Sequence, residues 1–313
     1  MKKGIKSASN PTTILADELG KEAGTIGQLS DRIERYEKAK IQSSSMSHYI
    51  RNNHPKQHKL YTKIHDCGGY LRFNHYPSVN EVRLAQAYFC EKALLCRFCA
   101  IRRGAKYISR YKDRFDCLMD ANPNLKAYLV TTTVKDGENL KERFNHLKKS
   151  TQYNHKKRHL RNRTCEAKKA SASVWSYEFK KGKNSGLWHP HAHAIWLCEE
   201  EPSQIKLSEE WDKITGDSYI VNIKPMDMTN PVKAFCEVFK YSVKFSDQPQ
   251  DDTWHCYQTL RNKRLVGSFG DFYGIPEPDN LLDDPLEGLE FEIILYNFIN
   301  GKYKKQAQAR GSE

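Results

Sequence analysis

Two consecutive segments with alternating side chains constrain the fold of this 313-residue chain more than any other feature. In residues 173–180 (SVWSYEFK), Trp175, Tyr177 and Phe179 alternate with smaller or polar residues. A period of two is that of a β-strand, whose successive side chains point to opposite faces. A Lys-Gly-Lys-Asn-Ser-Gly turn separates this segment from a second apolar run at 190–198. The pattern predicts an antiparallel β-hairpin.

Further elements surround the hairpin in a regular order. Residues 126–134 (KAYLVTTTV) are rich in β-branched and aromatic residues and predict a strand, and 138–159 predict a helix. After the hairpin, 207–214 read as a helix and 219–224 as a strand. The order β-α-β-β-α-β predicts an α+β fold with a ferredoxin-like antiparallel sheet and helices on one face.

We assign this α+β domain to residues 116–250. The remaining sequence suggests three more segments. Residues 1–60 are polar, with no sustained apolar periodicity apart from a candidate short helix at 31–40, and predict a flexible basic arm. Residues 61–115 are rich in cysteine and aromatic residues and predict a zinc knuckle. Residues 251–313 form a C-terminal extension to which no role is assigned.

The charge of the chain points to a polyanionic partner. There are 51 Lys and Arg residues against 38 Asp and Glu residues, a net charge of +13. Residues 141–170 alone hold eleven Lys and Arg against two Glu. Such a run is either a solvated face or a surface for phosphates. The candidate DNA-binding residues are Arg97, Arg102, Arg103, Lys156, Lys157, Arg158, Arg161 and Arg163.

Nine cysteines, an odd number in a chain of this size, argue against a disulfide framework, and the sequence shows no signal peptide and no apolar run of about 18 residues. We therefore expect a soluble, cytoplasmic protein that does not enter a membrane. Cys96 and Cys99 form a C-x2-C pair, and Cys67 and Cys90 precede it. Four thiolates would suit a structural zinc site, and the alternative is buried free thiols.

The second hairpin strand carries closely spaced histidines. His191 and His193 lie two apart, so both imidazoles project from one face of the strand. Glu178, on the neighbouring strand and away from the aromatic stripe, is the natural third ligand. Imidazoles bind Mn, Zn, Ni or Co well and Mg less well. A carboxylate ligand would shift the preference of the site toward harder cations. The alternative is a set of surface histidines on an exposed hairpin.

A late helix carries a tyrosine beside a carboxylate. Asn230 and Pro231 are a start signal, and the helix is expected to run to about residue 245. Glu237 and Tyr241 lie four apart, hence side by side, and Lys240 and Lys244 flank them. Such a tyrosine would attack a phosphodiester if a metal polarised the phosphate, with the lysines stabilising charge and Glu237 acting as general base. The alternative is an ordinary amphipathic helix.

Together these residues resemble the replication initiators of rolling-circle plasmids, in the His-hydrophobic-His (HUH) endonuclease superfamily. The resemblance is to the group with one catalytic Tyr and a Glu, and it spans roughly residues 60–246. His189 stands where that family usually has Asn or a similar residue, and it either ligates the metal or flanks the site. The matching motifs are residues 129–134, 188–193 and 237–244, preceded by 65–71, 89–99 and the Arg102-Arg103 pair.

The resemblance implies an enzyme that nicks one DNA strand with Mg or Mn as cofactor. It would cut at a plasmid's double-stranded origin, stay on the 5′ phosphate through Tyr241, and terminate by hydrolysis or strand joining aided by Glu237. Residues 116–250 would be the catalytic domain. The implied partners are origin DNA, with a single-stranded cleavage site and a double-stranded recognition site, and host helicase and polymerase. A homodimer is left open.

Three other interpretations remain open on the sequence. Alternating histidines also occur in the histidine-triad nucleotide hydrolases and transferases, although that family needs no tyrosine helix. A non-catalytic DNA-binding regulator with a zinc knuckle would bind DNA without a covalent adduct. A transposase or mobilisation relaxase of the same superfamily would share the chemistry.

Overall fold

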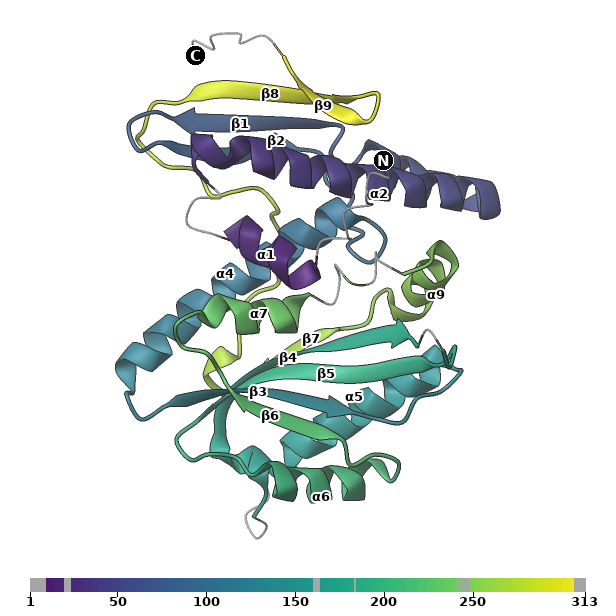
Figure 1. Cartoon of the computed structure of the whole chain (residues 1–313), viewed down its shortest axis with the longest axis vertical. Coiled ribbons are helices and arrows are strands. Elements are labelled where there is room, and N and C mark those ends of the chain that lie inside the picture. The colour runs from purple at the N-terminus through teal and green to yellow at the C-terminus, as the bar shows by residue number, and fades with distance from the viewer. Residues whose placement is uncertain are drawn as a thin grey trace, which may run out of the picture. The chain divides into compact units, whose positions relative to one another are not determined.

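The structure is a computed structural model that describes residues 10–19, 24–159, 164–182, 184–240, 244 and 248–306. The chain divides into two compact units (Figure 1). The first unit comprises residues 1–106 and 278–313, and the second comprises residues 107–277. Helix α4 (Arg97–Ala121) contributes residues to both units. No helix among the described residues is long and apolar enough to cross a membrane.

The second unit is built on a five-stranded sheet with the order β6-β3-β5-β4-β7, in which every neighbouring pair is antiparallel. The mixed α+β fold with an antiparallel sheet is therefore confirmed, and the hairpin is the β4–β5 pair. The elements of this unit after α4 are β3 (Lys126–Thr133), α5 (Leu140–Lys157), η3 (Glu166–Lys169), β4 (Ala170–Lys181), β5 (Trp188–Cys198), α6 (Gln204–Thr215), β6 (Val221–Pro225), α7 (Pro231–Phe239), α9 (Gln250–Leu260), β7 (Val266–Phe269) and η4 (Gly270–Phe272).

Helices pack on both faces of this sheet, whereas the sequence predicted helices on one face. The Phe144 ring of α5 contacts Tyr177, with ring centroids 5.9 Å apart. The neighbouring residue Ser176 donates a hydrogen bond to the carbonyl of Val238 in α7. Since successive strand residues point to opposite faces, α5 and α7 lie on opposite sides (Figure 1). The additional helix α7 has an apolar stripe of its own to bury.

That stripe of α7 packs against α4. Phe239 stacks on Tyr107 with ring centroids 5.2 Å apart, and Phe235 meets Phe115 edge to face. Helix α7 begins at Pro231 as predicted and ends at Phe239, with Lys240 as its C-cap. The predicted continuation to about residue 245 falls mostly outside the described residues.

The first unit contains a four-stranded antiparallel sheet with the order β2-β1-β8-β9. Its last two strands come from the end of the chain, so the predicted C-terminal extension is shared between the two units. The elements of the first unit besides the start of α4 are α1 (Pro11–Leu19), η1 (Ile26–Gln28), α2 (Leu29–Asn53), η2 (Pro55–Gln57), α3 (His58–Asp66), β1 (Tyr70–Tyr76), β2 (Glu81–Ala87), β8 (Glu292–Ile299) and β9 (Lys302–Lys305).

The segment predicted as a flexible arm, residues 1–60, differs most from expectation. It contains α1 and the 25-residue helix α2, whose Tyr36 and Ile50 are fully buried. Polar residues also occupy the buried side of α2, among them Arg32 and Ser43. Because these polar side chains interrupt the apolar stripe, the helical period is hidden in the sequence.

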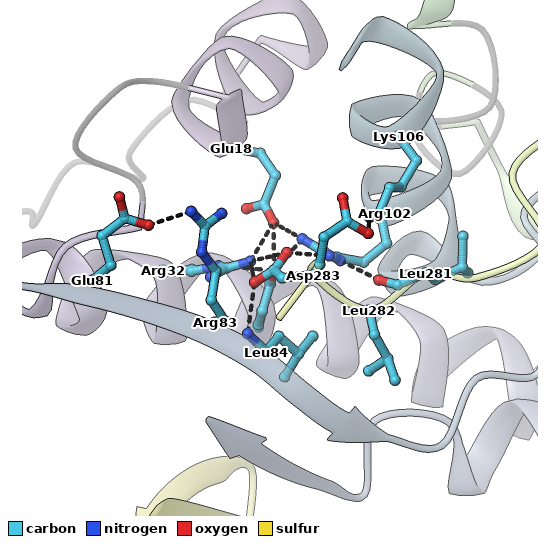
Figure 2. A network of polar contacts seen from close by, with 12 residues as sticks. Glu18, Arg32, Glu81, Arg83, Leu84, Arg102, Lys106, Leu281, Leu282 and Asp283 are labelled. Atoms are coloured by element: carbon cyan, nitrogen blue, oxygen red, sulfur yellow. Dashed lines mark hydrogen bonds and ion pairs between the residues drawn. The ribbon is translucent and has the colours of Figure 1, made fainter. Parts of the chain in front are cut away.

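Arg32 belongs to a buried network of ion pairs that joins four distant segments (Figure 2). The Arg102 guanidinium lies 2.7 Å from Glu18 and 2.6 Å from Asp283. The Arg32 guanidinium lies 2.9 Å from the other oxygen of Asp283. Paired charges of this kind satisfy each other inside a protein, where an unpaired charge would be very costly. The network anchors the C-terminal segment to the first two helices.

This network corrects part of the predicted DNA-binding set. Arg102 is only 3% exposed and its charge is neutralised by Glu18 and Asp283, so it is not available to phosphates. Arg97 is 4% exposed and is buried in the same unit. Arg103 is half-buried, and its contact with DNA stays a prediction.

The network predicts a loss of stability in acid. Burial raises the pKa of Glu18, but Arg32 and Arg102 outweigh it and lower the pKa from 4.5 to about 2. A carboxylate with a lowered folded-state pKa stabilises the fold above its unfolded pKa, and this contribution disappears as the pH falls through the folded pKa. The free energy of unfolding should therefore fall between pH 4.5 and about 2.

We expect Glu18→Gln to lower the free energy of unfolding at pH 7 by on the order of 3 kcal/mol and to flatten its dependence on acid pH. Urea unfolding at several pH values measures both effects. Glu34→Gln is the control, because Glu34 pairs with Lys38 on the surface. Equal stability of the two variants at pH 7 would contradict a stabilising role for the network.

Candidate metal centres

The pairing of three strands brings the predicted metal ligands together. In the register of β4 and β5, Glu178 lies opposite His191 and Ser176 lies opposite His193. On the other side of β5, Thr131 of β3 lies opposite His193. The two histidines share a face because they are two residues apart on one strand. Ser176 and Glu178 of β4 share the face on which α7 packs.

The three candidate ligands form a compact and buried group. The ligand atoms of Glu178, His191 and His193 all lie within 4.8 Å of one another. His191 Nε2 is 3.1 Å from Glu178 Oε1, and His193 Nε2 is 3.5 Å from Glu178 Oε2. The Glu178 side chain is 1% exposed and the two imidazoles are 11% and 12% exposed. The alternative of histidines scattered on an exposed hairpin surface does not match this burial.

The electrostatics of the group favour the protonation states that bind metal. Burial raises the pKa of Glu178, but the imidazoles of His191 and His193 and the ammonium of Lys244 hold it well below its usual value. Burial lowers the pKa of His191, against the opposing effect of Glu178. Near neutral pH the group therefore offers a carboxylate and a neutral imidazole at His191, which are the forms that coordinate a cation.

The residues of this group fit a divalent cation. Glu178 Oε2 and His193 Nε2 are buried and have no hydrogen-bond partner among the described residues. Buried polar atoms are nearly always paired, and an ion between these two would satisfy both. A set of two imidazoles and one carboxylate suits Mn and similar first-row ions, with the carboxylate favouring harder ions.

Two hydrogen bonds distinguish the histidines from one another. His193 Nδ1 lies 3.1 Å from the hydroxyl of Thr131, which orients the ring so that Nε2 faces Glu178. His189 Nδ1 instead lies 2.6 Å from Asp136, and His189 is not part of the compact ligand group. The sequence did not identify Thr131 or Asp136, although Thr131 lies in the Thr-rich strand motif. Only the strand register pairs them with the histidines.

The lysines predicted beside the nucleophile have partners in the structure. Lys244 donates a hydrogen bond to Glu178, the candidate metal ligand. Lys240 is buried at the end of α7 and forms an ion pair with Glu237. Glu237 is not part of the compact ligand group. Tyr241 lies outside the described residues.

The four predicted zinc ligands form a second group, in the first unit. The sulfur atoms of Cys67 and Cys99 are 3.4 Å apart, those of Cys67 and Cys96 are 3.5 Å apart, and those of Cys90 and Cys99 are 3.6 Å apart. All four residues are buried. Tetrahedral zinc with Zn–S bonds of about 2.3 Å separates its sulfur ligands by roughly 3.8 Å. The geometry fits a structural metal ion.

Neighbouring groups support the same interpretation. The backbone N–H of Cys90 donates to the sulfur of Cys67 at 3.4 Å, a bond that favours a thiolate. Lys40 is buried close by, where burial lowers its pKa and attraction to Cys67 and Cys96 opposes that shift. A nearby ammonium offsets the negative charge that four thiolates leave on a zinc site.

Three of the basic residues predicted to bind DNA lie at the end of α5, Lys156 and Lys157 within it and Arg158 as its C-cap. Lys156 is exposed, while Lys157 and Arg158 are half-buried. Arg158 stacks over the Phe269 ring at 3.7 Å from its centroid. Arg161 and Arg163 lie outside the described residues. Since α5 packs on the sheet face opposite to α7, Lys156, Lys157 and Arg158 lie across the sheet from the candidate metal ligands.

The fold and the two ligand groups define an α+β protein with one candidate site for a hard divalent cation and one for zinc. Comparison with known proteins gives the family. The sequence profile of the Rep_1 replication protein family matches residues 81–292, and the chain belongs to this family. Protein rep of Streptococcus pneumoniae serotype 2 (strain D39 / NCTC 7466) is 26% identical over 231 residues, which are 68% of this chain and 70% of that protein. No solved structure matches the chain.

Proposed function

We propose that this chain initiates rolling-circle replication of a plasmid by nicking one strand of its double-stranded origin. Membership of a replication protein family supports a role at origin DNA. The observation that carries the proposal of strand cleavage is the buried group of Glu178, His191 and His193. A carboxylate and two imidazoles in this arrangement are suited to hold Mg or Mn beside a phosphodiester.

We assign the nucleophile to Tyr241. Its phenolate oxygen would attack the phosphorus and break the bond to the 3′ oxygen, which takes up a proton from solvent, leaving a 5′-phosphotyrosine and a free 3′ hydroxyl. Lys244, three positions after Tyr241, donates to Glu178, which supports a nucleophile segment near the ligand group. A bound cation would polarise a nonbridging phosphate oxygen.

Three further residues have proposed roles in this reaction. Lys240 and Lys244 would stabilise the charge that develops on the phosphate, because ammonium groups in a partly buried site act strongly on nearby anions. Glu237 would accept a proton from the water or DNA hydroxyl that later releases the phosphotyrosine. The Glu237 carboxylate forms an ion pair with Lys240 at the end of α7.

The topology and the superfamily of the catalytic domain are also part of the proposal. The element order β3-α5-β4-β5-α6-β6, with the strand order β6-β3-β5-β4, supports a ferredoxin-like assignment. Histidines on the central strand β5 and a tyrosine after α7 support membership of the HUH endonucleases with a single Tyr and a Glu. Zinc bound by Cys67, Cys90, Cys96 and Cys99 would have a structural role. Host helicase and polymerase would extend the 3′ hydroxyl.

A pair of histidine variants tests the metal group. With Mn²⁺ and a single-stranded origin oligonucleotide, His193→Ala should reduce the nicking rate at least about 100-fold, because it removes one of three cation ligands. His189→Ala is the matched control on the same strand and face. It should keep most of the activity, since His189 pairs with Asp136 outside the ligand group.

The same variants distinguish a ligand from a structural residue. Titration of Mn²⁺ followed by its electron spin resonance signal should show weaker binding by His193→Ala and wild-type binding by His189→Ala. Equal nicking rates of wild type and His193→Ala would remove the metal assignment. Loss of Mn²⁺ binding by His189→Ala would instead place His189 among the ligands.

A further inference from the structure

A stripe of cations follows one flank of α5. Lys141, Lys148 and Lys156 are spaced by seven and eight residues, which places them on one side of the helix. They span fifteen residues, or roughly 22 Å along the helix axis. Leu140, Phe144 and Leu147 are buried against the sheet, and Lys148 is half-buried at the edge of that side, where it approaches the sheet residues Trp175 and Tyr177.

The stripe meets a second basic segment at a small pocket. The loop before β7 reads Arg261-Asn262-Lys263-Arg264, and all four residues are exposed. Between this segment and α5 lies a pocket of about 140 Å³. The described residues that line it include no Asp or Glu. They are Lys148, Gln152, Trp175, Tyr177, Arg264, Val266, Gly267 and Ser268.

The floor of this pocket is held in place by close packing. A Cβ on Gly267 would lie 2.3 Å from the Trp175 ring, so only glycine allows the ring to lie against β7. The Trp175 indole N–H donates to the Tyr177 hydroxyl at 3.1 Å. Arg264 Nε donates to the carbonyl of Val266 at 3.0 Å, which orients the guanidinium at the rim. Direct contacts therefore hold the pocket floor and the Arg264 side chain in position.

The lining of the pocket suits a backbone phosphate better than a stacked base. Proteins that grip single strands stack bases on accessible aromatic rings. Here Trp175 is 9% exposed and Tyr177 is 3% exposed, so neither ring offers a free face. An ammonium, a guanidinium and an amide without any carboxylate are suited to a phosphate oxygen. The length of the cation stripe suits the backbone of a duplex.

We propose that this α5–β7 pocket binds a backbone phosphate of duplex DNA, on the sheet face opposite to Glu178, His191 and His193. The choice of DNA as the ligand rests on the proposed function at origin DNA. The location of the pocket does not follow from the nicking chemistry. The protein would then hold a duplex on one face of the sheet and a single strand on the other.

Salt-dependent binding of a duplex tests the pocket. Fluorescence anisotropy would follow a labelled duplex of about 30 base pairs and the matching single strand, without added Mg²⁺ or Mn²⁺. Each phosphate contact contributes about 0.9 to the slope of log K against log salt. Lys148→Gln with Arg264→Gln should reduce the duplex slope by about 1 and weaken duplex binding about 10-fold, with a smaller change for the single strand.

The control removes the same charge from exposed residues of the other unit, Lys302→Gln with Lys304→Gln, and should keep the wild-type slope. A wild-type slope for the pocket variant, or an equal reduction in the control, would overturn the proposal. So would an equal loss of duplex and single-strand binding. The binding assay requires no cleavage. A wild-type protein that fails to nick DNA would therefore contradict the proposed function without changing the interpretation of the duplex-binding measurement.

Discussion

Tyr241→Phe is expected to abolish the covalent protein–DNA adduct completely while leaving DNA binding intact. The substitution removes one oxygen atom, which is the only atom of the side chain able to attack phosphorus. Cleavage should fall to the rate without enzyme, because the metal group alone lacks the proposed nucleophile. An oligonucleotide labelled on the 3′ side of the nick, denaturing electrophoresis and mass spectrometry of the adduct measure this result.

Tyr219→Phe is the matched control, since Tyr219 is 69% exposed in the same unit. It should give the wild-type amount of adduct. Recovery of labelled adduct from Tyr241→Phe would show that another residue is the nucleophile. Metal-independent phosphate transfer that survives Tyr241→Phe would favour the histidine-triad interpretation, and DNA binding without any adduct in the wild type would favour a non-catalytic regulator.

The second large effect is expected from the cysteine group. Structural zinc contributes on the order of 10 kcal/mol or more to the folding of small metal-dependent domains. Cys96→Ser should therefore abolish stoichiometric zinc binding and unfold much of the first unit, because the four cysteines join the end of α3, the segment after β2 and the start of α4. Metal analysis of the purified protein, circular dichroism and limited proteolysis measure these effects.

Cys198→Ser provides the comparison, because Cys198 is equally buried but stands outside the cysteine group. It should retain one zinc per chain and lose only the modest stability expected of a small core change. A wild-type protein that contains no zinc and melts like Cys96→Ser would identify the cysteines as buried free thiols.

Local pattern in the sequence was sufficient for the elements of the second unit from β3 to the start of α7 and for naming the candidate ligands. The alternation in the hairpin predicted β4 and β5, and the spacing of His191 and His193 placed both on one face. The distance of Glu178 from the turn was enough to place it on the paired strand near them. These predictions succeeded because a strand has a fixed period of two and a hairpin pairs its strands in a defined register.

Features that depend on contacts between distant segments could not be predicted in this way. Arg102 has the same charge as any surface arginine, and only the fold surrounds it with Glu18 and Asp283. Thr131 is one of three consecutive threonines, and only the register of β3 and β5 gives it His193 as a partner.

The sequence by itself determined which residues form the hairpin, which side chains share its faces, and which residues are candidates for the two metal groups. Only the tertiary structure decided that residues 29–53 form a buried helix, that the chain's last strands complete the first sheet, and that the basic helix lies across the sheet from the histidines. The reason is that period and turn type are encoded within a few neighbouring residues. Burial and charge pairing depend instead on residues brought together from far apart in the chain.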